Sequence, residues 1–257
     1  MKAMIFAAGL GTRLKPITDT MPKALVPVCG QPLLYHVINK LVAAGYDDLV
    51  VNVHHFSDQI IHYLHFHDFG ARIAVSDERD FLRETGGGIR YAKHLLTEDE
   101  IPGQAGNDGI EPFLVHNVDI VSNLDLNWLR EQHREGALAT LVASERKTQR
   151  YFLFDEDNRL KGWTNIATGE VRSPFPDIDP DRCRKLAFAG IHLMSPAIFD
   201  AFDRYGFGDR FSIVDFYLRA CADYPIYAAV PPDFQLVDVG KKETLSEAER
   251  VCEVILR

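Results

Sequence analysis

Apolar and polar positions along the chain alternate between two patterns, short apolar runs and helical spacing. Residues 4–8 and 48–53 are largely apolar runs of strand length, which predicts buried strands. Between them, residues 32–44 carry apolar side chains three and four positions apart, which predicts an amphipathic helix that ends at Gly45. The order strand, helix, strand implies parallel strands with a helix packed across them.

The same two patterns continue along the rest of the chain. Further helices are predicted over residues 57–66, 89–96, 124–135, 212–222 and 242–256, with Ser57 as a cap for the first of them and Ser195-Pro196 opening one more. Further strands are predicted over residues 73–76, 113–120, 139–144, 151–154, 159–163, 186–193, 226–230 and 234–240. The polar stretches 97–112 and 167–184 are predicted to be loops. The predicted fold class is therefore α/β, with a mixed, mainly parallel, Rossmann-like sheet flanked by helices.

Length and composition allow one large domain. The chain has 257 residues, 46% of them hydrophobic, which is enough for one sizeable core. Its formal net charge of −9 argues against a nucleic-acid partner. No apolar run approaches the roughly 20 residues that cross a bilayer, and no signal-peptide pattern is present, so a cytoplasmic protein without a membrane partner is expected. The four cysteines lack metal-ligand spacing and are expected to be reduced thiols.

A glycine-rich loop follows the first predicted strand and carries the strongest chemical signal. Gly9 and Gly11 permit backbone conformations closed to other residues and keep side chains away from a ligand. Such a loop presents several N–H groups in one direction, which cradles an anion. Arg13 adds a permanently charged, bidentate group, and Lys23 adds a mobile point charge. A tight connection with two solvated cations is the structural alternative.

Two familiar phosphate loops do not fit this stretch. The chain contains no Walker A pattern. The dinucleotide fingerprint of nicotinamide oxidoreductases fails because its third glycine position holds Leu14 and no helix opens cleanly before Pro16.

A longer pattern does fit. Residues 7–14 (Ala-Ala-Gly-Leu-Gly-Thr-Arg-Leu) and 22–28 (Pro-Lys-Ala-Leu-Val-Pro-Val) together resemble the signature of the sugar-1-phosphate nucleotidyltransferases. This two-part match spans about 22 residues and is far more specific than a lone glycine pattern. The resemblance implies a GT-A-like nucleotide-binding fold. The nucleotide contacts that it implies in this stretch are Ala8, Gly9, Gly11, Thr12, Arg13 and Lys23.

Three consecutive glycines, from Gly86 to Gly88, stand before the predicted helix over residues 89–96. Glycines at a helix start are costly unless the backbone must approach something closely, and a flexible loop is the alternative. In the resembling family a Glu-Thr-Gly-Gly segment holds the base and ribose of the nucleotide, which implies this role for Thr85 and Gly86. The variant Glu-Thr-Gly-Gly-Gly-Ile looks most like the branch that activates N-acetylmuramate 1-phosphate.

Two predicted strands end in carboxylates, Asp119 and Asp238. Ligands of open α/β sheets bind outside the carboxyl ends of the strands, although an aspartate after a strand is also a common turn residue. The resemblance implies that Asp119 binds the catalytic metal and that Asp238, in an Asp-x-Gly context, is the second metal ligand. It also implies that Asn117 contacts the nucleotide. Mg²⁺ is the expected cofactor, since it prefers oxygen ligands.

Two positions depart from the family's pattern on the sugar side. Val118 stands where the family has the glycine of an Asn-Gly-Asp motif, and Phe152 stands where many relatives have the glycine of Arg-Tyr-Gly. Gly190, in the strand predicted over residues 186–193, is the expected sugar-side residue, with a packing glycine as the alternative.

Several histidines between residues 54 and 67 raise the alternative of a zinc site. His54 and His55 are adjacent at a strand end and point to opposite faces, whereas His62 and His65 share a helix face. No cysteine and no His-Glu-x-x-His pattern completes a site, which argues against zinc.

The resemblance implies one catalytic domain over residues 1–257, with a nucleotide-binding half at about 1–120 and a sugar-binding half at about 121–257. The implied reaction joins an NTP and a sugar 1-phosphate to give an NDP-sugar and pyrophosphate. Because the nucleophile is already an anion, catalysis rests on positioning and electrostatics. The residues expected to carry it are Arg13, Lys23 and Asp119. UTP and N-acetylmuramate 1-phosphate are the expected substrates, in cell-wall recycling.

Two alternatives to this function stay open. One is guanylyl transfer to mannose or heptose 1-phosphate. The other is a non-catalytic, nucleotide-sugar-binding regulatory relative, which Val118 and Phe152 favour and the retained basic and carboxylate residues oppose. Small-molecule substrates and a monomer or small homo-oligomer are expected. Nothing follows the last predicted helix, so no C-terminal β-helix is expected.

Overall fold

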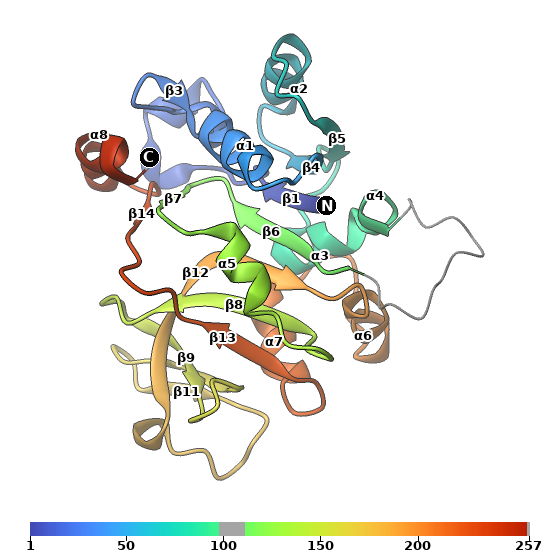
Figure 1. Cartoon of the computed structure of the whole chain (residues 1–257), viewed down its shortest axis with the longest axis vertical. Helices are drawn as coiled ribbons and strands as arrows, with labels where there is room; N and C mark the ends of the chain where they lie inside the picture. The colour runs from blue at the N-terminus through green and yellow to red at the C-terminus, as the bar shows by residue number, and fades with distance from the viewer. Residues whose placement is uncertain (98–110, 256–257) are drawn as a thin grey trace.

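A computed structural model describes residues 1–97 and 111–255, with side chains described to residue 250. Its centre is a mixed sheet in which the strand order is β11-β10-β9-β12-β6-β1-β4-β5, and β8 joins β12 to β13 (Figure 1). Strands β6, β1, β4 and β5 run parallel, and the antiparallel pairs involve the later strands. The predicted α/β class, with a mixed, mainly parallel sheet flanked by helices, is confirmed.

The strands of this sheet are β1 (Lys2–Phe6), β4 (Asp48–Val53), β5 (Arg72–Asp77), β6 (Phe113–Asn117), β8 (Ala139–Ser144), β9 (Arg150–Phe154), β10 (Leu160–Asn165), β11 (Glu170–Arg172), β12 (Arg184–Met194) and β13 (Ile226–Ala229). Two small antiparallel pairs lie outside it: β2 (Pro27–Val28) with β3 (Gln31–Pro32), and β7 (Ile120–Ser122) with β14 (Leu236–Asp238). The α-helices are α1 (Leu33–Ala43), α2 (Ser57–Phe66), α3 (Glu84–Tyr91), α4 (Lys93–Thr97), α5 (Leu126–Glu131), α6 (Ile198–Arg204), α7 (Ile213–Ala220) and α8 (Lys242–Ile255). Short 3-10 turns span Thr12–Leu14, Ile17–Asp19, Lys23–Leu25 and Pro180–Arg182.

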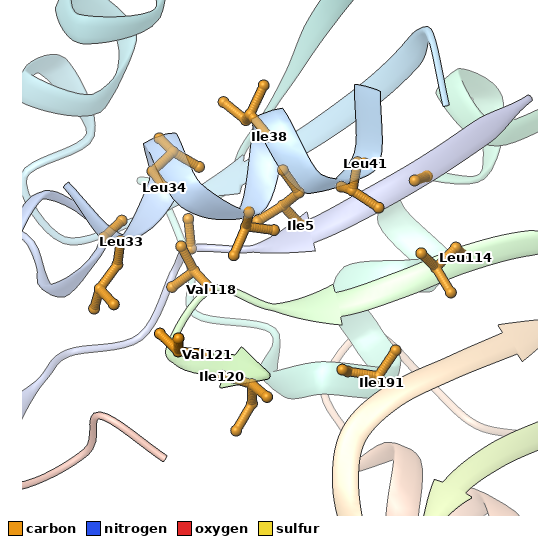
Figure 2. Packing of buried hydrophobic residues seen from close by; sticks show 14 of the residues in the cluster. Ile5, Leu33, Leu34, Ile38, Leu41, Leu114, Val118, Ile120, Val121 and Ile191 are labelled. Carbon is orange, nitrogen blue, oxygen red and sulfur yellow. The ribbon is translucent and has the colours of Figure 1, made fainter. Parts of the chain in front are cut away.

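Helices cover both faces of the sheet because successive strand residues point to opposite sides. On β1, Ala3 and Ile5 join a core with α1, α2, α5 and α8, whereas Met4 joins a second core with α3, α4, α6 and α7. Figure 2 shows the first of these cores, where Leu34, Ile38 and other α1 side chains lie over β1 and β6. Buried, branched side chains on both faces explain why the parallel strands read as apolar runs.

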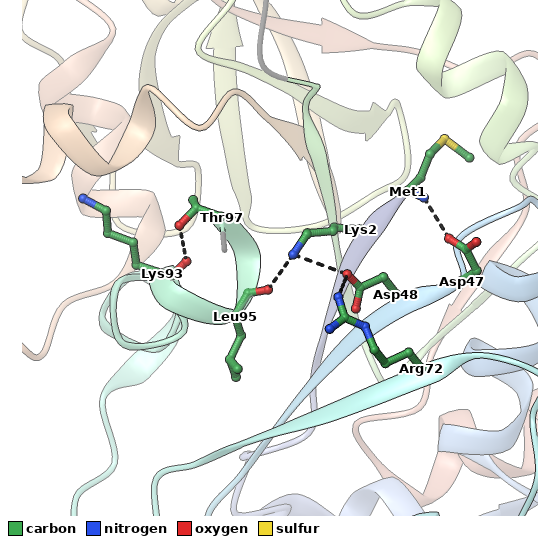
Figure 3. Close-up of polar contacts among 8 residues, drawn as sticks. All are labelled: Met1, Lys2, Asp47, Asp48, Arg72, Lys93, Leu95 and Thr97. Atoms are coloured by element: carbon green, nitrogen blue, oxygen red, sulfur yellow. Dashed lines mark hydrogen bonds and ion pairs between the residues drawn. The ribbon is translucent and has the colours of Figure 1, made fainter. Parts of the chain in front are cut away.

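Polar contacts fix the amino-terminal ends of the parallel strands (Figure 3). The Lys2 ammonium donates to the Leu95 carbonyl at 3.1 Å and pairs with Asp48 at 3.3 Å. Arg72 reaches the same carboxylate at 2.6 Å. These contacts connect α4 with the amino-terminal ends of β1, β4 and β5. The glycine loop lies at the other, carboxyl end of β1.

Most predicted elements appear within a few residues of their expected bounds, and the misses have local causes. The first strand ends at Phe6, two residues earlier than predicted, so Ala7 and Ala8 belong to the loop. The strand predicted over residues 113–120 breaks into β6 and β7 around Asp119. The loop predicted over residues 167–184 contains strand β11. The pattern did not predict this strand, because its residues are exposed and show no apolar spacing. Nearly all of the loop predicted over 97–112 lies outside the described residues.

Two predictions about single residues are wrong. Ser57 was expected to cap α2, but the N-cap residue is Phe56 and no side chain accepts a hydrogen bond there. Reduced thiols were expected throughout, but Cys29 is disulfide-bonded, whereas Cys183 and Cys221 are free. Cys29 lies where α8 packs on β2, and its N–H donates to the Glu249 carboxylate at 3.0 Å. A pairing that depends on such a tertiary contact leaves no spacing signal in the sequence.

The three glycines lie inside α3 rather than before a helix. A Cβ on Gly86 would stand 2.2 Å from the Phe211 ring, and one on Gly87 would stand 2.3 Å from the Asp209 carbonyl oxygen. The Phe211 carbonyl accepts hydrogen bonds from the N–H groups of both glycines. The expected close approach is therefore real, but the approaching group at these two positions is the chain's own segment before α7. Among the described residues, no helix has the length and apolarity needed to span a bilayer.

Candidate active site

A pocket of about 400 Å³ opens at the carboxyl ends of β1, β4 and β6. This is the edge at which parallel α/β sheets bind ligands. Its lining residues are Phe6, Ala7, Ala8, Gly9, Lys23, Asn52, Leu82, Glu84, Thr85, Asn117, Val118, Asp119 and Ser212. The glycine loop, the start of α3 and the segment after β6 thus meet around one cavity, although they are far apart in the sequence.

The glycine loop needs its two glycines for different reasons. Gly11 has φ of +63°, and a Cβ there would stand 2.8 Å from the Thr18 side chain. Thr18 holds the turn by donating its hydroxyl to the Gly11 carbonyl at 2.8 Å. Gly9 is exposed and has no atom within 4 Å of its Cβ position, so it leaves open space beside the pocket. Gly11 therefore shapes the loop, and Gly9 keeps the ligand side clear.

Lys23 and Asp119 form an ion pair at the floor of the pocket. Lys23 opens the short turn Lys23–Leu25 and is 9% exposed, and Asp119 lies in the break between β6 and β7. A lysine that is largely withdrawn from water needs a charged partner, and Asp119 is that partner. The predicted catalytic lysine and the predicted metal carboxylate are thus in direct contact.

Asp238 is placed beside Asp119 by β14. Val239 donates its N–H to the Asp119 carbonyl at 2.8 Å, and Asp238 pairs with Ile120 in the β14–β7 ladder. Burial, and then the neighbouring Asp119 charge, raise the pKa of Asp238 above its usual value, and the nearby cations Lys23, Arg13 and Arg146 oppose this rise. One of its oxygens, Oδ1, is buried without a hydrogen-bond partner.

Arg13, in the exposed turn after Gly11, lies near Asp238. A Cβ on Gly240 would stand 2.9 Å from the Arg13 Nη2 and 2.8 Å from the Asp238 Oδ1. The glycine of the Asp-x-Gly segment therefore leaves room for the guanidinium beside the carboxylate. Thr12 lies in the same exposed turn and is not among the lining residues of the pocket.

The donor set at this place suits a hard divalent cation bound together with a ligand. Two carboxylates lie side by side, and an orphaned buried oxygen on Asp238 lacks a partner. Within residues 1–97 and 111–250, no three histidine, cysteine, aspartate or glutamate side chains gather as a metal cluster. Mg²⁺ typically takes one or two protein carboxylates and completes its shell with water and phosphate oxygens.

The start of α3 forms the wall opposite the loop, where Glu84 and Thr85 line the pocket. The Thr85 hydroxyl oxygen accepts a hydrogen bond from the Ile213 N–H at 2.9 Å, and Arg210 pairs with Glu84 at 2.9 Å. Gly86 is not among the lining residues and packs against Phe211 instead. Of the two residues expected to hold the base and ribose, only Thr85 therefore faces the cavity.

Asn117, at the end of β6, and Gly190, in β12, lie in contact where the parallel part of the sheet meets its antiparallel part. Gly190 has φ of +73° within an irregular part of β12, and a Cβ there would stand 2.5 Å from the Asn117 Nδ2. Gly190 is not among the lining residues of the pocket. Its missing side chain leaves room for the side chain of Asn117, which does line the pocket.

The two departures from the family's pattern have different surroundings. Val118 is 4% exposed and belongs to the core below α1, as Figure 2 shows, while it also lines the pocket. Phe152 is 2% exposed and packs against Phe154 and Phe188 in the other core. Phe152 thus fills the interior of the protein, and Val118 remains the departure that borders the cavity.

Three residues at or near the site were not predicted from the sequence. Asn52, within the apolar run of β4, lines the pocket and accepts from the N–H groups of Ala7 and Ala8. Glu78 is fully buried and hydrogen-bonded to Asn52. Arg146, after β8, adds positive charge near Asp238. A polar residue inside an apolar strand was the available signal for Asn52, whereas Glu78 sits in a polar stretch that reads as a loop.

The arrangement is suited to a polyanionic ligand. The glycine loop, Lys23 and Asp119 line one open cavity together with hydrogen-bonding groups at the start of α3. Asp238 lies next to Asp119 and feels the charges of Lys23 and Arg13, but neither Asp238 nor Arg13 is among the lining residues. Cations and loop N–H groups bind phosphate oxygens, and paired carboxylates bind a divalent cation that accompanies them.

Comparisons with known proteins find relatives of a single family. The family model described as "Nucleotidyl transferase" matches residues 2–157. The chain is 32% identical to N-acetylmuramate alpha-1-phosphate uridylyltransferase of Caulobacter vibrioides, an alignment that covers 96% of this chain and 95% of that protein. It is 29% identical to a mannose-1-phosphate guanyltransferase of Eremothecium gossypii, over 78% of this chain, and that alignment spans about half (51%) of the relative's length.

A solved structure supports the fold. The crystal structure of HddC from Yersinia pseudotuberculosis superposes with a TM-score of 0.75 at 20% identity, covering 97% of this chain and 98% of that one. A second crystal structure of HddC holds GMP-PN. At this level of identity the superposition shows a shared architecture.

Proposed function

The chain belongs to the family of sugar-1-phosphate nucleotidyltransferases, and from that premise we propose that it transfers the uridylyl group of UTP to N-acetylmuramate 1-phosphate. The products are the UDP-sugar and pyrophosphate. The Caulobacter vibrioides relative carries this proposal, because its name gives the same reaction and the alignment covers nearly the whole of both chains. A place in cell-wall recycling, in the cytoplasm, belongs to the same proposal.

The pocket supports a nucleotide-binding half over residues 1–120. The N–H groups of the loop from Gly9 to Thr12 are assigned to the β- and γ-phosphates, because such a loop forms an anion cradle. Thr85 and Asn117 are assigned to the base and ribose, since both line the cavity. Gly86 acts in this assignment by bringing α3 close to the segment before α7.

Mg²⁺ is the proposed cofactor, held by Asp119 and Asp238. The adjacent carboxylates and the orphaned Asp238 oxygen are what support it. When bound, the ion supplies positive charge to the phosphate oxygens at the reacting centre. Two carboxylates leave the rest of its coordination shell to water and substrate oxygens.

The two cations of the signature are assigned to the phosphates that change. Lys23, held at the pocket floor by Asp119, neutralises the α-phosphate and the incoming sugar phosphate. Arg13, exposed in the turn after the loop, neutralises the departing pyrophosphate. The sugar phosphate oxygen attacks the α-phosphorus in line without a general base, because it is already ionised, so the protein contributes charge and orientation.

The sugar is assigned to the half over residues 121–257, next to Asn117 and Gly190. Gly190 leaves room for the Asn117 amide, and the pairing of β12 is irregular there. Val118 narrows the same place, compared with a glycine. The protein is proposed to act as a monomer or small homo-oligomer on small molecules alone.

Guanylyl transfer to a mannose or heptose 1-phosphate is the second candidate. Its support is the 29% identical guanyltransferase relative. Base and sugar are therefore tested together. We would measure pyrophosphate release with Mg²⁺ for UTP, GTP, TTP, CTP and ATP against N-acetylmuramate, N-acetylglucosamine, glucose, mannose and heptose 1-phosphates.

The proposal expects UTP with N-acetylmuramate 1-phosphate to give the highest kcat/KM of the panel. A higher value for GTP with mannose or heptose 1-phosphate would replace it with the second candidate. Release from no pair, by a protein that still binds nucleotide sugars, would favour a regulatory relative, and Val118→Gly would then be the first variant to make.

A further inference from the structure

A buried hydrogen-bonded pair, Asn52 and Glu78, lies directly behind the glycine loop. The Asn52 Oδ1 accepts hydrogen bonds from the N–H groups of Ala7 at 2.8 Å and Ala8 at 3.3 Å. The Asn52 Nδ2 donates to the Glu78 Oε1 at 2.8 Å. Asn52 is 2% exposed and Glu78 is fully buried. A carboxylate is costly to bury, so each of its hydrogen bonds matters to the local structure.

The other oxygen of Glu78 reaches the opposite wall of the pocket. The Glu78 Oε2 accepts the N–H of Arg83 at 3.2 Å, one residue before α3 begins. The next two residues, Glu84 and Thr85, line the pocket. One carboxylate thus connects the glycine loop, through Asn52, with the wall that faces it.

The third glycine of α3 fits this pair. A Cβ on Gly88 would stand 2.9 Å from the Glu78 Oε1 and 3.2 Å from the Asn52 Nδ2. Gly86 and Gly87 face the segment before α7, so the run of three glycines serves two separate close approaches.

We propose that Glu78 is a positioning residue for nucleotide binding, which acts through Asn52 on one wall and through Arg83 on the other. Glu78 has no access to the pocket, whereas Asn52 lines it. By fixing the Asn52 amide, Glu78 directs the Ala7 and Ala8 N–H groups inward, so that the N–H groups from Gly9 onward remain for phosphate. This inference rests on the proposed function only in naming the ligand as a nucleoside triphosphate.

The donor and acceptor count of the pair suggests a decisive test. The Asn52 NH₂ and the Arg83 N–H need acceptors, and the Glu78 carboxylate supplies both. Glu78→Gln keeps one acceptor and turns an amide NH₂ toward a donor. Asn52→Asp turns a second carboxylate toward Glu78. The double variant Asn52→Asp/Glu78→Gln restores every contact with the roles exchanged, since the new amide at position 78 donates to the new carboxylate at position 52 and accepts from the Arg83 N–H.

The first readout is the affinity for UTP and for GTP, each with Mg²⁺ and measured by calorimetry. We expect each single variant to bind the better nucleotide about 10- to 100-fold more weakly, the scale of one buried polar group left without its partner. The double variant should return to within about threefold of the wild type, because its buried polar groups are all paired again.

The second readout needs no ligand. Hydrogen exchange in the peptide that contains Ala7 and Ala8 should speed up in both single variants and slow down again in the double variant. A matched control, Asn127→Asp/Glu135→Gln, makes the same chemical changes at exposed positions and should leave affinity and exchange unchanged.

Three results would overturn the proposal. One is single variants that bind nucleotide normally while their melting temperatures fall, which would make the pair structural only. Another is a double variant no better than the worse single variant. The third applies if a single variant does not fold: a double variant that folds but binds nucleotide more weakly than the wild type would also overturn the proposal. Failure of the wild type itself to bind UTP or GTP would instead contradict the proposed function, and the exchange readout would still judge the pair.

Discussion

Asp238 combines burial, a neighbouring like charge and one oxygen without a hydrogen-bond partner. Burial and Asp119 both raise its pKa, so the ionised form is disfavoured in the free protein. A divalent cation between the two carboxylates would remove both penalties. The residues that hold the metal are thus expected to destabilise the protein without it, as strained functional groups commonly do.

This leads to an opposed effect of Asp238→Asn on stability and on activity. Because the folded pKa lies above the unfolded value, ionisation of Asp238 costs stability as the pH rises above the unfolded pKa, and this cost is complete above the folded pKa. Removing the charge should raise the melting temperature of the metal-free protein, by about 2–4 °C for each kcal/mol regained. The same variant should lose the further rise that Mg²⁺ and UTP give to the wild type. A lower melting temperature without metal would contradict this reading of Asp238.

Asp119 is expected to matter more for the reaction. It pairs with Lys23 and is a proposed metal ligand, so Asp119→Ala removes a principal electrostatic group and leaves a buried lysine without its partner. We expect kcat to fall more than about 100-fold, the scale of losing such a group. Steady-state kinetics with saturating Mg²⁺ measure this. The control is Asp157→Ala in an exposed turn, and near-normal turnover of Asp119→Ala would refute the metal assignment.

The roles of single residues could be predicted where the residues belong to a sequence motif. They could not be predicted where the role depends on a tertiary contact. Arg13, Lys23, Asp119 and Asp238 were expected together from two short segments and two strand ends, and the fold brings them together. Glu78 had no motif, because its role depends on a hydrogen bond to a residue 26 positions away. For the same reason the disulfide at Cys29 could not be foreseen.

At the scale of elements, glycines are needed for two different reasons: close packing between segments of the chain, and open space for a ligand. Gly86 meets the Phe211 ring, so it serves the packing of α3 against the segment before α7. A Cβ on Gly9 would meet no atom within 4 Å, so packing does not require this glycine, and its proposed role is toward the ligand. Local sequence alone could not tell these roles apart, because both glycines occur in glycine-rich segments next to a predicted strand or helix.

The two glycines should therefore respond differently to alanine. Gly86→Ala should lower the free energy of unfolding by about 1–3 kcal/mol, the usual cost of overpacking a core. Gly9→Ala should leave the free energy of unfolding nearly unchanged and weaken nucleotide binding, because its Cβ points into open space at the loop. Denaturant unfolding and calorimetry with UTP measure the two effects. Unchanged nucleotide affinity in a folded Gly9→Ala variant would show that the loop does not contact the ligand.

Strands and helices were predictable where apolar spacing was strong, as in α1 and β4. Boundaries failed where backbone geometry rather than hydrophobicity decides, as at the break between β6 and β7 that exposes Asp119. Strand β11 escaped because all three of its residues are exposed, so pairing with β10 alone defines it.

At the scale of the whole molecule, two buried histidines on neighbouring strands contribute to the loss of stability in acid. Burial lowers the pKa of His116 to about 4 and that of His192 to about 3. His192 Nδ1 and the Tyr217 hydroxyl form a hydrogen bond at 2.6 Å. Unfolded histidines take up protons below pH 6.5, whereas these folded ones do not, so stability is full above about pH 6.5 and falls as the pH approaches 4.

The loss should be on the order of 3 kcal/mol per histidine by pH 4, at about 1.4 kcal/mol for each unit of pKa difference. His192→Gln keeps a hydrogen-bonding group for Tyr217, as donor or acceptor, but cannot bind this proton. We expect it to reduce the decline of unfolding free energy between pH 6.5 and 4 by about 3 kcal/mol, the contribution of this one histidine. Denaturant unfolding at several pH values measures this. The exposed His94→Gln should decline like the wild type, and an unchanged decline in His192→Gln would exclude this origin of acid sensitivity.

The most direct measurement is the stoichiometry of the reaction in the wild type and in Asp119→Ala, with Mg²⁺ and then with excess chelator. UTP and N-acetylmuramate 1-phosphate should give UDP-sugar and pyrophosphate in a one-to-one ratio. The rate should collapse in the variant and in the chelated wild type. Sustained one-to-one turnover without divalent metal, or with Asp119 replaced, would contradict the mechanism. Absence of both products in the wild type, for this pair and for every other pair of the panel, would contradict the enzymatic function itself.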